Sequence, residues 1–89
     1  MNRAERRALE RRLRKIGDQE LPSGRIVTVA ELYAAALVLC GLGRLDDVLS
    51  ALEVGTPKVL AGVERVIESA LRAAETLGLK APTSLGESK

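Results

Sequence analysis

The sequence contains no histidine, phenylalanine or tryptophan, and it has a single tyrosine, Tyr33, and a single cysteine, Cys40. Without histidine, the commonest general base and metal ligand is missing. One cysteine can neither close a disulfide within the chain nor build a thiolate zinc cluster, and in its apolar surroundings Cys40 is expected to be a small buried residue. No glycine-rich loop has the phosphate-binding form. These absences predict a protein that is not an enzyme and that uses no cofactor and no metal.

Long apolar runs are also missing. The longest, from Leu32 to Leu42, is much shorter than the roughly 20 residues that a membrane-spanning helix needs. The N-terminus lacks the order of charged and apolar residues that marks a secretory signal. The first helix offers only three aliphatic side chains, Leu9, Leu13 and Ile16, for insertion into a membrane surface. We therefore expect a cytoplasmic protein with no membrane partner.

The residues that are present predict an all-α fold, a small bundle of four helices with a flexible C-terminal tail. Apolar residues recur at helical spacing, and turn residues separate the segments. The expected helices cover about residues 3–16, 29–41, 44–54 and 57–77. Residues 1–79 then form a single helical domain. Residues 80–89, rich in Pro, Thr, Ser, Gly and charge, form a disordered tail.

Two helix starts are marked by capping boxes, in which a side chain and the third residue of the helix satisfy each other's free backbone N–H groups. Asn2 with Glu5 opens the first helix, and Thr28 with Glu31 opens the second. Between these helices, Arg25-Ile26-Val27 is expected to be extended, but the sequence shows no partner strand for it.

Charge is distributed unevenly along the chain. Residues 1–16 carry a net charge of +5, and the remaining residues carry −3. On a helical wheel the apolar stripe of the first helix faces one way, and a basic face lies opposite it. The residues of this basic face are Arg3, Arg7, Arg11, Arg14 and Lys15. The third helix has an acidic outer face, which contains Asp46, Asp47, Ser50 and Glu53.

Three interpretations of the basic face remain open. It can be an ordinary solvated helix exterior, a docking surface for an acidic protein partner, or an electrostatic surface for nucleic acid. Nucleic acid is disfavoured because no aromatic residue accompanies the arginines for base stacking, and no Gln or Asn lies among them to read bases. A helix-turn-helix formed by the second and third helices is disfavoured too, because it would turn acidic residues toward phosphates.

The second helix is apolar on all sides from Leu32 to Cys40, and the fourth has a heptad-like seam. Together they need more covering surface than the first and third helices can give, which predicts self-association. The residues expected in the core or in an oligomer interface are Leu37, Leu60, Val63, Ile67 and Leu71.

The opening segment Met1-Asn2-Arg3-Ala4-Glu5-Arg6-Arg7-Ala8 resembles the start of many short bacteriophage-encoded proteins, particularly tail-assembly and other virion-associated proteins. The resemblance covers eight residues and implies no fold and no functional residue. It favours a virus-encoded protein, in the host cytoplasm or the virion, that assembles with or inhibits a larger machine. We therefore expect a stoichiometric protein-binding or assembly protein, with sequence-independent DNA or RNA binding as the alternative.

Overall fold

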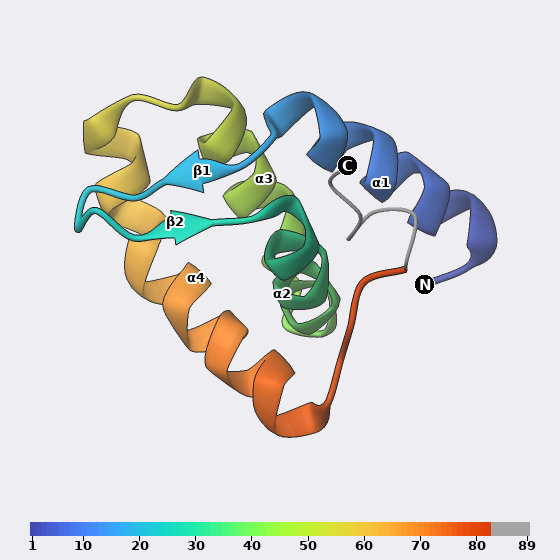
Figure 1. Cartoon of the computed structure of the whole chain (residues 1–89). Helices are drawn as coiled ribbons and strands as arrows, with labels where there is room; N and C mark the ends of the chain where they lie inside the picture. The colour runs from blue at the N-terminus through green and yellow to red at the C-terminus, as the bar shows by residue number, and fades with distance from the viewer. Residues whose placement is uncertain (83–89) are drawn as a thin grey trace.

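Four helices and one short hairpin make up residues 1–82, which are the residues described by the computed structural model of the chain (Figure 1). The helical fold class is confirmed, and the helix bounds agree with the expected ones except that α3 begins one residue later. In order, the elements are α1 (Arg3–Ile16), β1 (Gln19–Glu20), β2 (Ile26–Val27), α2 (Val29–Gly41), α3 (Leu45–Val54) and α4 (Pro57–Leu77).

Local signals fix where the first two helices begin. The Glu5 backbone N–H donates to Oδ1 of Asn2 at 2.8 Å, and the Asn2 N–H donates to Oε1 of Glu5 at 2.9 Å. The same reciprocal pair forms between Thr28 and Glu31 at the start of α2. A capping box satisfies backbone N–H groups that the first turn of a helix leaves free. Both predicted capping boxes are therefore confirmed.

The segment between α1 and α2 corrects one expectation. Ile26–Val27 has a partner strand after all: it pairs with Gln19–Glu20 in an antiparallel hairpin, with Gln19 opposite Val27. The strand β1 is only two residues long and polar, so the sequence carries no apolar alternation that would predict it. Val27 and Leu21 are almost fully buried, so the hairpin also closes one end of the core.

Helix α2 lies at the centre of the fold and makes its most extensive contacts with α4 (Figure 1). Ala34, Ala35 and Ala36 are buried, and such small side chains let neighbouring helix backbones approach closely. This position explains why α2 is apolar on all sides. Helices α1, α3 and α4 all contact α2 within one chain, and self-association stays a prediction.

Helix α4 begins and ends as the sequence predicts. Thr56 caps its first turn, Pro57 is its first residue, and Gly78 follows its last residue in the left-handed conformation with φ +72°. The Leu79 N–H donates to the Ala74 carbonyl at 2.9 Å, which completes a Schellman motif. Without a Cβ, glycine adopts this backbone conformation at little cost.

The five residues expected in a core or an oligomer interface all belong to one core within the chain. Leu60, Ile67 and Leu71 are buried, whereas Leu37 and Val63 are half-buried and pack against the same cluster. Nothing in this arrangement requires a second copy.

The structure corrects two further expectations, the burial of Cys40 and the disorder of the segment from residue 80. Cys40 is exposed, so its assignment as a buried residue was wrong; it lies on the outer side of α2, beside the turn to α3. Within the expected tail, Ala81 packs against the core, so the start of that segment is not free of the domain. Residues 83–89 of the expected disordered tail lie outside the described residues.

Candidate functional site: the basic face of α1

All members of the predicted basic face are exposed on α1. The helix is held to the body by a narrow apolar stripe, in which Leu9 is 4% and Leu13 is 0% exposed. Full burial of one leucine side chain stabilises a fold by about 1.5–3 kcal/mol. Because that stripe faces the core, the opposite side of the helix must face solvent, and this places the basic face outward. Arg3, Arg7, Arg11, Arg14 and Lys15 occupy that side of the helix as the sequence predicts.

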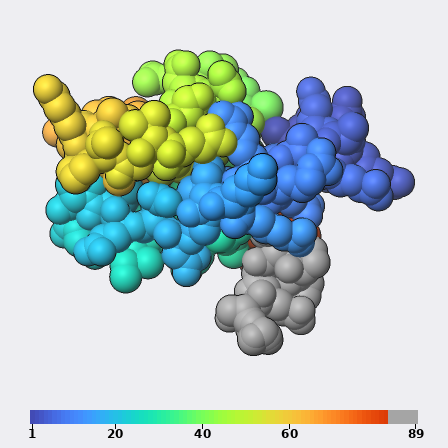
Figure 2. Space-filling view, turned by 90° about the horizontal axis from the view of Figure 1, so that it is seen from above, coloured from blue at the N-terminus to red at the C-terminus, as the bar shows by residue number. Residues whose placement is uncertain are grey.

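The two halves of α1 differ in their contact with the rest of the molecule. Every residue from Met1 to Ala8 is exposed, and Leu9 is the first buried residue of the chain. In the space-filling view the first turns of the helix extend beyond the body of the molecule (Figure 2). Arg3 and Arg7 therefore stand on a projecting segment, where a partner can approach them from several directions.

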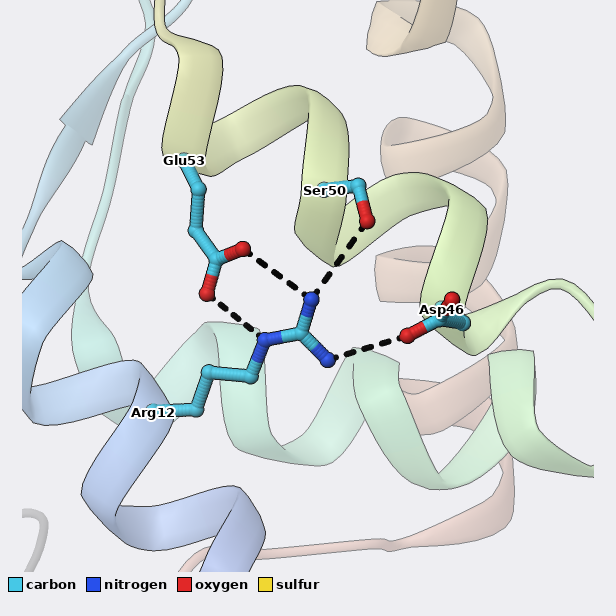
Figure 3. Close-up of polar contacts among 4 residues, drawn as sticks. All are labelled: Arg12, Asp46, Ser50 and Glu53. Atoms are coloured by element: carbon cyan, nitrogen blue, oxygen red, sulfur yellow. Dashed lines mark hydrogen bonds and ion pairs between the residues drawn. The ribbon is translucent and has the colours of Figure 1, made fainter.

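Arg12 is the one arginine of α1 that is tied to another helix (Figure 3). Its Nε donates to Oε2 of Glu53 at 2.6 Å and its Nη2 donates to Oε1 of the same carboxylate at 3.0 Å. The guanidinium also donates to Oδ1 of Asp46 at 3.1 Å and to Oγ of Ser50 at 3.4 Å. These bonds fasten the second half of α1 to α3.

The bonds between Arg12 and Glu53 shift the pKa of both side chains toward their charged forms. The hydrogen bond from Arg12 lowers the pKa of Glu53 below its ordinary value, and the nearby charges of Arg12 and Lys15 act in the same direction. The hydrogen bond to Glu53 is the largest cause that raises the pKa of Arg12, so that arginine keeps its charge at all accessible pH values. The acidic face of α3 is therefore partly neutralised from within the chain.

Sequence reasoning missed the role of Arg12. A usable signal exists: Arg12 flanks the apolar stripe of α1, and Asp46, Ser50 and Glu53 are spaced by four and three residues, so they line one face of α3. The set of bonds from Arg12 to Glu53, Asp46 and Ser50, which we call the Arg12 clamp, depends on the relative placement of α1 and α3. The sequence does not show this placement.

Most of the basic face forms no ion pair with the residues that the structure describes. Arg14 lies 3.9 Å from Glu10, four residues earlier on the same helix. Among residues 1–82, Arg3, Arg7 and Arg11 form no ion pair. They succeed one another at four-residue spacing, where like charges repel on a helix. Lys15 forms no ion pair among these residues either, although its charge lies near enough to Glu53 to lower the pKa of that carboxylate. We call the three arginines, Arg3-Arg7-Arg11, the arginine ladder.

Chemistry other than charge is sparse in the part of the chain that the structure describes. Within residues 1–82 no group of three His, Cys, Asp or Glu side chains lies close enough together to hold a metal ion. No helix in that range combines the length and the apolar character needed to cross a bilayer. The basic face therefore remains the most distinctive surface of the described residues.

Comparisons with protein-family models, curated proteins and solved structures found no match to the chain. The charge, exposure and contacts of the chain's own residues are therefore the observations that bear on its function. The arginine ladder and the projecting half of α1 supply those observations.

Proposed function

We propose that the protein is a non-enzymatic binding or assembly protein that docks stoichiometrically on an acidic surface of a larger protein through the basic face of α1. The observation that carries the proposal is the arginine ladder, whose three guanidinium groups form no ion pair among residues 1–82 and which begins on the projecting half of α1. A segment that holds its charges away from its own acidic residues is suited to meet acidic residues elsewhere.

The energetics of the ladder support a partner. Each like-charge step at four-residue spacing costs an isolated helix about 0.2–0.5 kcal/mol. A carboxylate placed between two arginines removes that repulsion and accepts charge-assisted hydrogen bonds from the planar guanidinium fork. Binding to an acidic protein surface would thus relieve the ladder, whereas solvent only screens it.

Nucleic acid is the alternative, because the +5 charge of residues 1–16 would also attract phosphates. Two features weigh against it. Tyr33, the single aromatic residue, is 4% exposed and cannot stack on a base. Asp46 and Asp47 are exposed on α3, whose acidic face borders α1, and they would repel a phosphate backbone. Any such binding would be electrostatic and independent of sequence.

Self-association and location are part of the same proposal. A homo-oligomer remains a prediction, which sedimentation analysis tests: a stable monomer over a wide concentration range would contradict it. An assembly role in the host cytoplasm or the virion agrees with the resemblance of Met1–Ala8 to phage tail-assembly proteins.

The test compares two doubly charge-reversed variants in a pull-down from the native host. Arg7→Glu/Arg11→Glu alters the ladder, and Lys58→Glu/Arg65→Glu makes the same charge change on exposed positions of α4. We expect the wild type and the α4 variant to retain the same partner, and the ladder variant to lose at least about tenfold in recovery. Equal recovery by all three proteins would contradict the proposal.

A second measurement separates the alternative. Fluorescence titration with double-stranded DNA and with RNA, each at low and high salt, should show no binding beyond weak, non-specific attraction. Micromolar binding that weakens steeply with salt and disappears in Arg7→Glu/Arg11→Glu would favour the nucleic-acid function instead.

A further inference from the structure

A groove of about 250 Å³ lies beside the arginine ladder, between the first three turns of α1 and the place where α2 ends and α3 begins. Its lining residues come from all three helices. They are Met1, Glu5, Ala8, Leu9, Arg12, Cys40, Leu45 and Leu49. Leu9 and Leu49 are buried, and Ala8 and Cys40 are exposed.

The chemistry of the groove is apolar. The two charged side chains in its lining are already bonded within the chain. One carboxylate oxygen of Glu5 accepts the Asn2 N–H, and Arg12 is held by Glu53 and Asp46. The remaining six lining residues are apolar or sulfur-containing. Such a site gains free energy by covering apolar side chains and offers little to a polar small molecule or an ion.

One rim of the groove is basic. Arg11 and Lys15 follow Ala8 by three and seven residues, so they lie on the same side of α1 as Ala8. Both are exposed. An occupant of the groove therefore meets apolar side chains at its centre and positive charge along the α1 edge.

We infer that the groove and the basic face together receive an amphipathic helix of the partner protein, with its apolar stripe in the groove and its carboxylates against Arg7, Arg11 and Lys15. This inference rests on the proposed function and adds the form of the partner. An amphipathic helix combines the two required elements in one segment, because residues at three- and four-residue spacing supply the stripe and their neighbours supply the flanking charge.

A second copy of this chain is a poorer occupant. The apolar stripes of α1, α2, α3 and α4 are buried, so residues 1–82 of a folded copy have no free amphipathic helix to donate. Its own groove carries the same basic rim, which would face the first rim with like charge. Nucleic acid would contact the basic rim, but it has no apolar stripe to fill the groove.

Cys40 gives the experiment a built-in probe, because it is the single cysteine of the chain, it is exposed, and it lines the groove. The rate of its reaction with Ellman's reagent is measured in the full chain without and with a synthetic helical peptide. The peptide has a leucine stripe flanked by glutamates. One control peptide replaces each glutamate by lysine, and another replaces each stripe leucine by glutamine. We expect the first peptide alone to slow the reaction at saturation by at least about tenfold.

A pair of neutral variants tests the groove without changing the charge of α1. Ala8→Gln puts a polar side chain into the groove, and Ala4→Gln makes the same change one turn earlier, at an exposed position outside the lining. We expect Ala8→Gln to weaken peptide binding about tenfold and Ala4→Gln to change it by less than about twofold, since an unpaired polar group in an apolar contact is costly. Circular dichroism confirms that both variants are folded.

The outcomes separate the two proposals. Equal peptide binding by Ala8→Gln and Ala4→Gln, with Cys40 unprotected, overturns the groove inference, while the pull-down with Arg7→Glu/Arg11→Glu still decides the proposed function.

Protection of Cys40 that rises with protein concentration in the absence of peptide would assign the groove to a second copy. A slow Cys40 reaction in the dilute free protein would assign it to the chain itself. Protection by DNA or RNA but not by the peptide would assign it to nucleic acid. Each of these three results overturns the inference.

Discussion

The two halves of α1 have the same kind of sequence but different surroundings. Residues 3–8 and residues 9–16 are both rich in arginine, yet every residue of the first half is exposed, whereas the second half buries Leu9 and Leu13. In the second half, Arg12 is bonded to α3, whereas Arg3 and Arg7 in the first half have no acidic partner among residues 1–82. The comparison shows that position relative to a neighbouring helix, and not residue type, divides the arginines into structural and available ones.

Because of this division, the net charge of residues 1–16 overstates the positive charge that is available to a partner. The +5 charge of residues 1–16 includes Arg12, whose charge is balanced by Glu53 and Asp46. The surface that a partner meets is therefore smaller and nearer the N-terminus than the count suggests. Substitutions of Arg12 or of the buried leucines should affect stability, and substitutions of the exposed arginines of the basic face should affect binding.

The largest expected effect on the free energy of unfolding comes from truncating the buried Leu13 in the second half of α1. Leu13 is 0% exposed, so Leu13→Ala should lower the free energy of unfolding by about 2–5 kcal/mol through lost burial and a residual cavity. Urea unfolding followed by circular dichroism measures it. Leu42→Ala, at a residue 67% exposed, is the control and should change stability by less than about 0.5 kcal/mol. Similar small losses in both variants would mean that the second half is not anchored as described.

Breaking the Arg12 clamp should have an intermediate effect on the free energy of unfolding, and the size of this effect should depend on pH. Glu53→Gln should lower the free energy of unfolding at pH 7 by less than Leu13→Ala does, because the pair is partly exposed. The pKa of Glu53 is lowered in the folded state, so the stabilisation is fully present above the unfolded pKa, about 4.3, and is lost as the pH falls through the folded pKa. Urea unfolding across this range should show the gap between wild type and variant closing in acid.

The matched control for the clamp is Glu75→Gln, at an exposed carboxylate of α4 that has no ion pair within residues 1–82. Its stability should follow that of the wild type at every pH. A Glu53→Gln gap that persists unchanged below the lowered pKa would contradict the assignment of the clamp.

The smallest effect, and one of opposite sign, is expected in the first half. Arg7→Glu places a carboxylate between Arg3 and Arg11, so it should stabilise α1 by about 0.2–0.5 kcal/mol for each new pair. Helix content by circular dichroism and urea unfolding would detect it, with Arg7→Gln as the neutral reference. A clear loss of stability would show that Arg7 makes a structural contact like that of Arg12.

Local features of the fold were predictable because short-range chemistry decides them. Asn2 with Glu5, Thr28 with Glu31, and Gly78 each determine a helix end through hydrogen bonds to residues within five positions. The basic face was predictable for a related reason, since the apolar stripe of α1 fixes which side faces the core.

Features that depend on how separate elements are placed relative to one another were missed. The β1–β2 hairpin joins a polar pair of residues to an apolar one, and the Arg12 clamp joins residues 41 positions apart. The exposure of Cys40 depends on where α1 and α3 leave α2 uncovered, which no pattern within α2 reveals. The groove is missed for the same reason, because three helices form it together.

The exposure of the first half of α1 also bears on its local opening. With no buried side chain before Leu9, this half is held mainly by its backbone hydrogen bonds and by the Asn2–Glu5 capping box. Helical turns of this kind open with a small fraction of the free energy of global unfolding, so their amide protons should exchange with solvent far sooner than those around Leu13. The arginine ladder therefore begins in the part of the fold that frays most easily, and a partner that holds it would slow that exchange.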